Sequence, residues 1–149
     1  MITRSELRSI PEIYKQIQKD KEQLRFLREK STALPSQLTG TERVQSSHAN
    51  NSGKYVEAAV DLENEIKDEE QILIDLQHRA RGFIQALPEK THMERLAKKT
   101  MRYRYIGFQE TVSKSGYGEC CEWTEIASLL GYDIRYLQRI EANTIIVLR

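Results

Sequence analysis

The last 27 residues of the chain, residues 123–149, read WTEIASLLGYDIRYLQRIEANTIIVLR. Two short helices joined by a turn fit this stretch, because Ala127 is small enough for a close helix crossing and Gly131 can adopt the positive φ that a tight turn needs. Asp133 stands where the N-cap of the second helix belongs. The stretch therefore predicts a helix-turn-helix.

The second helix of this pair should have one apolar and one polar face. Ile134, Leu137 and Ile140 recur at helical spacing, and we expect them to pack on Ile126, Leu129 and Leu130 of the first helix. The other face carries long polar side chains that can reach bases and phosphates in a major groove. The candidate DNA-contacting residues are Asp133, Ile134, Arg135, Tyr136, Gln138, Arg139 and Asn143. The alternative interpretation is a plain helical pair whose arginines are only solvated.

A basic run precedes this pair, on a helix predicted over about residues 91–106. It contains Arg95, Lys98, Lys99, Arg102 and Arg104. Cations at this place can hold a DNA backbone while another helix reads bases, so we expect phosphate contacts from Lys98, Lys99 and Arg102. A solvated helical face is the alternative. The formal net charge is only +1, which argues against non-specific coating of DNA.

The C-terminal sequence resembles a known family at this point. The run LGYDIRYLQRIEANTIIVLR is similar to the second part of bacterial sigma factor region 4, with Arg139, Ile140, Glu141 and Ala142 at the place of its Gln/Arg-Ile-Glu-Ala motif. Together with MRYRYIG at residues 101–107, it resembles the phage and prophage sigma-70-like transcriptional regulators of Gram-positive bacteria, a group that includes late-gene activators of the ArpU and RinA kind. The resemblance implies a DNA-binding regulator that acts with host RNA polymerase in the bacterial cytoplasm.

The chain departs from this family in two places. Ile134 and Arg135 stand where the sigma modules have an Arg-Glu pair, so we do not expect an ordinary sigma promoter element as the target. Residues 109–122, QETVSKSGYGECCE, form an insertion rich in Ser, Gly and Thr, which predicts a loop. Such a loop beside a DNA-binding face could touch a phosphate or a partner protein, or be a tolerated surface insertion.

The N-terminal part predicts a long antiparallel coiled-coil hairpin over residues 1–90. Apolar residues recur with alternating spacings of three and four from Ile10 to Leu34 and again from Tyr55 to Leu87, with Asp20 and Glu69 as polar interruptions. Residues 35–53, rich in Ser, Asn and Thr, are expected to form the connecting loop. The predicted fold is therefore all-α, with this hairpin followed by a small sigma region 4-like helix-turn-helix domain over residues 91–149.

A two-helix hairpin buries little surface, which favours a homodimer through the hairpin, while docking on RNA polymerase is the alternative. The expected partner of the C-terminal domain is double-stranded DNA. Two other interpretations stay open: a DNA-recognition subunit of a phage packaging machine, similar to small terminase subunits, and a polymerase-binding module that does not read DNA by itself.

The sequence contains no motif typical of an enzyme, a metal-binding protein or a membrane protein. No nucleophile elbow, phosphate-cradling glycine loop or HExxH occurs, so we expect a non-enzyme without a cofactor. The three histidines lack ligand spacing, and adjacent Cys120 and Cys121 form no CxxC pair, so neither a metal site nor a disulfide framework is expected. No apolar run is long enough to span a membrane, and no signal peptide is recognisable. We expect a cytoplasmic protein.

Overall fold

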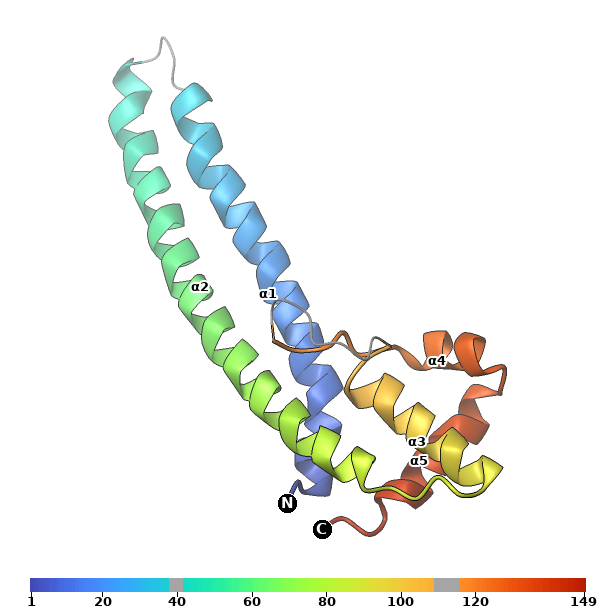
Figure 1. Cartoon of the computed structure of the whole chain (residues 1–149). Helices are drawn as coiled ribbons and strands as arrows, with labels where there is room; N and C mark the ends of the chain where they lie inside the picture. The colour runs from blue at the N-terminus through green and yellow to red at the C-terminus, as the bar shows by residue number, and fades with distance from the viewer. Residues whose placement is uncertain (38–41, 109–115) are drawn as a thin grey trace. The chain divides into compact units, whose positions relative to one another are not determined.

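The computed structural model describes residues 1–37, 42–108 and 116–149, and within these ranges the chain is helical with no strand (Figure 1). The helices are α1 (Arg4–Gln37), α2 (Glu42–Gln85), α3 (His92–Tyr105), α4 (Trp123–Leu130) and α5 (Ile134–Ile145). The all-α prediction is confirmed for these residues. Helices α3, α4 and α5 lie in the C-terminal stretch of the chain for which the sequence predicts short helices.

The predicted loop over residues 35–53 is wrong at both ends. Helix α1 continues to Gln37, and α2 already begins at Glu42, while residues 38–41 lie outside the described part of the chain. Ser, Asn and Thr each cost less than about 1 kcal/mol relative to Ala in a helix, and Gly costs about 1 kcal/mol. Penalties of this size weaken a helix without ending it, so composition alone overestimated the loop.

The chain forms two compact units. One unit combines Met1–Tyr14 with Gln71–Arg149, and the other contains Lys15–Glu70. We call them the C-terminal unit and the helical-pair unit. The first turns of α1 and the last turns of α2 thus belong to the same unit as α3, α4 and α5.

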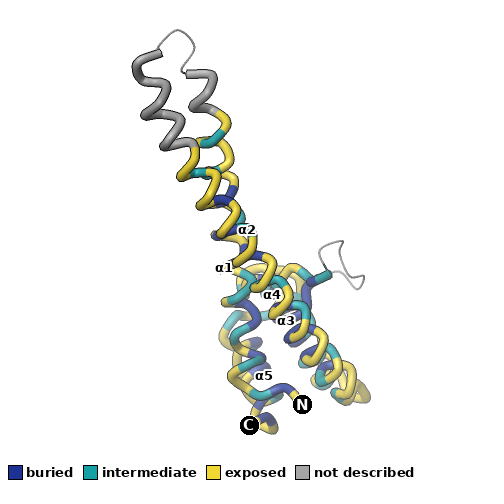
Figure 2. The backbone as a smooth tube through the Cα atoms, turned by 90° about the vertical axis from the view of Figure 1, so that its left-hand side faces the viewer, coloured by how far each residue is buried: buried dark blue, intermediate teal, exposed yellow. Residues whose placement is uncertain are grey.

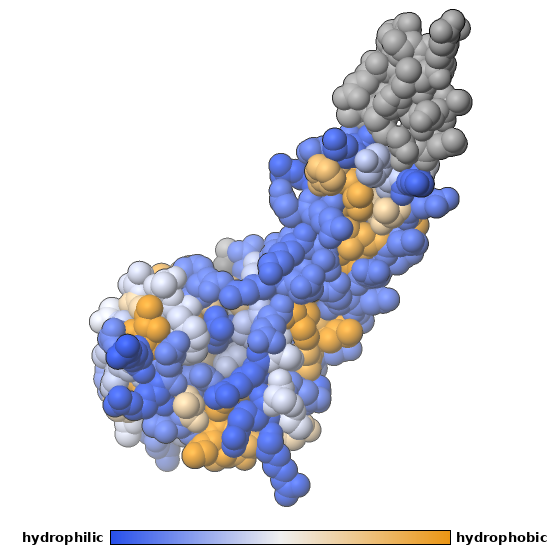
Figure 3. All heavy atoms as spheres, turned by 180° about the vertical axis from the view of Figure 1, so that it is seen from behind, coloured by the Kyte–Doolittle hydropathy of each residue, from blue (hydrophilic) through white to orange (hydrophobic). Residues whose placement is uncertain are grey.

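In the helical-pair unit, α1 and α2 run in opposite directions. Lys21 pairs with Glu70 at 3.2 Å and Arg28 with Glu63 at 3.1 Å, so positions advancing along α1 meet positions receding along α2. The predicted apolar positions Ile17, Leu24, Ala59, Leu62 and Ile66 are buried. Hydrophobic side chains also show between hydrophilic ones along the long helices in Figure 3.

The C-terminal unit has its main core between α3, α4 and α5. The buried side chains of this core are Leu96, Tyr103, Cys121, Ile126, Leu137 and Ile140. The base of the α1–α2 pair adds Leu7, Ile10, Leu73 and Ala80, all fully buried. Figure 2 shows the buried parts of the described chain in dark blue. The predicted stripe of α5 is therefore buried at Leu137 and Ile140, whereas Ile134 is only half-buried.

No helix in the described ranges is long and apolar enough to cross a membrane.

Candidate nucleic-acid interface

The turn between α4 and α5 has the backbone geometry that the sequence predicted. Gly131 adopts φ 74° and ψ 28°, and its N–H donates to the carbonyl of Ala127 at 2.8 Å. A side chain in this left-handed conformation is costly for most residues, which explains the glycine. Asp133 occupies the N-cap position of α5, but its side chain makes no capping hydrogen bond.

Ile126 anchors α4 in the core, where it is completely buried. Ala127 and Leu130 pack against the same core, whereas Leu129 is half exposed. At 100° per residue, Leu129 lies about 60° around the helix from Ile126, on the side away from Ala127 and Leu130, and therefore at the edge of the buried side of α4.

A buried hydrogen bond fixes α5 to α3. The Tyr105 hydroxyl donates to the Glu141 carboxylate at 2.8 Å, and both side chains are buried. Burial and the Glu141 charge raise the pKa of Tyr105 well above its usual value, because the phenolate would be desolvated and repelled. The Tyr105 phenol therefore stays a donor, and it holds α5 in one rotation about its axis.

With that rotation fixed, α5 presents a polar side to solvent. Arg135, Gln138, Arg139 and Asn143 are all exposed, whereas Leu137, Ile140, Glu141 and Ile145 are buried. We call the four exposed residues the outer face of α5. Their spacing of three and four residues places them along one side of the helix, within reach of a single groove.

Three other residues that we predicted to contact DNA lie outside the outer face of α5. Tyr136 is half-buried: its ring stacks on Tyr132 with 5.5 Å between centroids, and its hydroxyl donates to the Met93 sulfur at 3.3 Å. Ile134 is half-buried as well, and Asp133 is exposed. Tyr136 therefore supports α5 from the side of the core, and the outer face does not include it.

The three residues of α3 that we predicted to contact phosphates have different surroundings. The Lys98 ammonium donates to the carbonyls of Gln85 and Leu87, at 3.3 and 3.5 Å, and pairs with Glu89 at 3.4 Å. Lys98 thus caps the carboxyl end of α2, a favourable place for a cation. Lys99 is exposed, and the Arg102 guanidinium lies over the Tyr103 ring at 5.2 Å.

Arg104, the last cation of the basic run, points to a different side of α3. It lies over the Trp123 indole at 5.0 Å and donates to the Cys121 carbonyl at 3.2 Å. Trp123 is half-buried and packs against the core.

The described part of the 109–122 insertion, residues 116–122, is irregular and packed, while residues 109–115 lie outside the described chain. Gln77 of α2 holds it by donating to the carbonyls of Tyr105 (3.0 Å) and Gly118 (3.1 Å) and by accepting from the Gly118 N–H (2.8 Å). Residues 116–122 are thus a structural part of the unit. The sequence does not indicate this role, because Gln77 is simply a polar residue that follows Leu76 of the apolar pattern.

Cys120 and Cys121 are free thiols in this segment. Burial raises the pKa of the Cys120 thiol to about 12, which leaves it protonated and unreactive at neutral pH. In the described residues no group of three or more His, Cys, Asp or Glu side chains is arranged to hold a metal ion.

Comparison with known proteins found no matching family model, no matching curated protein and no matching solved structure.

Proposed function

We propose that the protein is a sequence-specific DNA-binding transcriptional regulator that inserts α5 into the major groove. The observation that carries the proposal is the outer face of α5, where Arg135, Gln138, Arg139 and Asn143 are exposed together on a helix whose opposite side is fixed in the core. Arginine and asparagine or glutamine are the side chains that recognise guanine and adenine edges by paired hydrogen bonds. A helix held in one rotation presents them in a constant register.

A phage or prophage activator acting with host RNA polymerase is the form of regulator that we propose, and this part rests on the sigma region 4 resemblance of residues 130–149. An alternative within this proposal is that the module binds polymerase and does not read DNA alone. The two differ in the effect of the outer face on DNA binding. Under the DNA-reading proposal, Arg135→Ala and Arg139→Ala each cost about 1–3 kcal/mol of binding free energy.

Enrichment sequencing of a random duplex library tests the proposal directly. The purified protein should recover a defined motif at roughly physiological salt, a condition that suppresses phosphate-only binding. The double variant Arg135→Ala/Arg139→Ala should lose or relax this motif. A matched control is Arg25→Ala/Arg28→Ala in the helical-pair unit, which should recover the wild-type motif. No motif with the wild-type protein, or the same motif with the outer-face variant, would contradict DNA reading by α5.

We further propose a homodimer through the helical-pair unit. Phe26, Val56 and Val60 are about half exposed there, at 52, 49 and 52%, and a second copy would cover them. Sedimentation equilibrium should then give twice the chain mass of 17.4 kDa, and Phe26→Ser/Val60→Ser should shift the protein to monomers. Met93→Ser, which changes a similarly exposed side chain on α3, is the control. A ring of many copies would instead favour the packaging-subunit alternative.

A further inference from the structure

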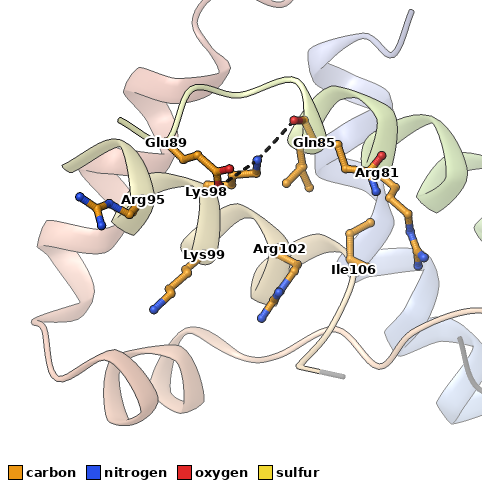
Figure 4. Close-up of a pocket in the computed structure, with 9 residues that line it drawn as sticks. Arg81, Gln85, Glu89, Arg95, Lys98, Lys99, Arg102 and Ile106 are labelled. Atoms are coloured by element: carbon orange, nitrogen blue, oxygen red, sulfur yellow. Dashed lines mark hydrogen bonds and ion pairs between the residues drawn. The ribbon is translucent and has the colours of Figure 1, made fainter. Parts of the chain in front are cut away.

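A pocket of about 460 Å³ lies between the end of α2 and one side of α3 in the C-terminal unit (Figure 4). Its lining consists of Arg81, Ile84, Gln85, Glu89, Arg95, Lys98, Lys99, Arg102 and Ile106. The cations of α3 in this lining follow one another at helical spacing, and Arg81 reaches the pocket from α2. The volume is in the range of small-molecule sites.

The charged side chains that line this pocket are mostly positive. Glu89 is the only carboxylate in its lining, and it pairs with Lys98, whose ammonium is further held by the two carbonyls at the end of α2. The lining therefore offers no second carboxylate to Arg81, Arg95 and Lys99. Arg95 donates to the backbone carbonyls of Thr91 and Lys90, at 3.4 Å each. Among the described residues, neither Arg81 nor Lys99 forms an ion pair.

The floor of the pocket is apolar. Ile84 and Ile106 are only 3 and 4% exposed, and the Nε atom of Arg102 is also shielded from water. Figure 4 shows the charged ends of Arg81, Arg95, Lys99 and Arg102 spread along the pocket, and like charges beside an apolar floor repel one another more strongly than they would in open solvent. An anion in the pocket would relieve this repulsion and gain charge-assisted hydrogen bonds from the side chains that it reaches.

We propose that this pocket binds a phosphate group carried by a larger molecule. Three guanidinium groups and one ammonium suit phosphate, since guanidinium forks engage two oxygens at once and lysine adds a mobile point charge. Arg81 and Arg95 then join Lys99 and Arg102 as binding residues, while Lys98 holds the α2 end in place. The proposal does not depend on DNA reading by α5, because it uses different residues on different helices.

Calorimetric titration with sodium pyrophosphate at constant ionic strength tests the site. We expect saturable binding by the wild-type protein, weakened about tenfold or more in Arg81→Gln and in Lys99→Gln, because each removes a charged hydrogen bond. Arg135→Gln, an exposed arginine outside the pocket, is the matched control and should bind pyrophosphate as the wild type does. Thermal melting of each variant by circular dichroism verifies that it is folded. Absence of saturable binding by the folded wild-type protein, or pyrophosphate affinities of Arg81→Gln and Lys99→Gln equal to that of the wild type, would overturn the proposal.

The source of the phosphate follows from a competition experiment. If a DNA duplex displaces pyrophosphate, the pocket receives a backbone phosphate of nucleic acid; if it does not, the pocket receives a free phosphorylated compound. Both results are compatible with the site and identify its ligand. The phosphate-site proposal and the DNA-reading proposal can fail independently. The motif recovered by enrichment depends on Arg135 and Arg139, whereas the pyrophosphate affinity depends on Arg81 and Lys99.

Discussion

The C-terminal unit and the helical-pair unit are both built from helices, but different interactions hold them. In the C-terminal unit, side chains from distant segments satisfy buried polar groups, as Gln77 does for residues 105 and 118 and as Tyr105 does with Glu141. In the helical-pair unit, the cross-helix contacts are a narrow apolar stripe, ion pairs near the surface and one polar pair, Asp20 with Glu69. The first unit is thus specified by particular contacts and the second by a repeating pattern. Substitutions should therefore have sharper effects in the C-terminal unit.

Gly118→Ala should give the largest effect. A Cβ at residue 118 would lie 1.8 Å from the Ile106 carbonyl oxygen, a backbone atom that cannot move without shifting the end of α3. We expect a loss of about 3 kcal/mol in the free energy of unfolding, measured by urea denaturation. Gly82→Ala is the control, since a Cβ added there in α2 would meet nothing within 4 Å, and it should stabilise by about 0.5–1 kcal/mol. Equal effects of the two substitutions would refute the close approach.

Tyr105→Phe should come next. The substitution leaves the Glu141 carboxylate buried without its 2.8 Å donor, so we expect about 2 kcal/mol of destabilisation. Tyr132→Phe, which removes an exposed 3.2 Å contact with His92, should change stability by less than about 0.5 kcal/mol. The same urea series measures both. A Tyr105→Phe protein as stable as the wild type would show that the hydrogen bond does not fix α5.

A smaller effect is expected from pH in the helical-pair unit, where the two polar interruptions of the apolar pattern meet. Asp20 is buried, and desolvation together with a hydrogen bond to Asp20 and its charge raises the pKa of Glu69 to about 7. Folding thus favours protonated Glu69. Its ionisation destabilises the folded state progressively as the pH rises from the ordinary glutamate pKa of 4.5 through 7.

Urea denaturation at pH 5 and pH 8 measures this effect. The wild-type protein should lose more stability between these pH values than Glu69→Gln, because the amide cannot ionise. Glu6 provides a contrast in the C-terminal unit: its hydrogen bond from Arg79 lowers its pKa to about 2, so its contribution is lost only below pH 4.5 and does not vary in this window. An identical pH dependence of wild type and Glu69→Gln would contradict the Asp20–Glu69 interaction.

The smallest effect is predicted for the exposed ion pairs of the helical-pair unit. Arg28 and Glu63 have side chains that are 56 and 41% exposed, so solvent and salt screen their attraction. Arg28→Ala should change the free energy of unfolding by less than about 0.5 kcal/mol, and this difference should shrink further when salt is raised. A cost above about 1 kcal/mol would mean that ion pairs, and not the apolar stripe, specify this unit.

The same contrast explains how much could be predicted from the sequence. Periodicity located α3, α4 and α5 and the buried positions Ile17, Leu24 and Ile66, because helical repeats are local in the chain. Glycine chemistry located the turn at Gly131. These features need no knowledge of distant segments.

The features that prediction missed depend on long-range contacts or on weak preferences. Gln77, Gly118 and the Tyr105–Glu141 bond acquire their roles only when segments at least 28 residues apart meet. Lys98 belonged to a basic run in the sequence, yet it caps α2. The 35–53 loop failed because polar composition lowers helix propensity without excluding a helix.

Whether α5 is the DNA-reading element can be tested by a two-dimensional NMR titration of the isotope-labelled full chain with a short duplex that carries the motif recovered by enrichment sequencing. At 17.4 kDa the protein is small enough for amide signals to be assigned residue by residue. We expect the signals of residues 133–143 to change most, with smaller changes at the α3 pocket and none along Lys15–Glu70. Changes concentrated in Lys15–Glu70, or DNA binding that leaves the signals of α5 unchanged, would contradict DNA reading by α5.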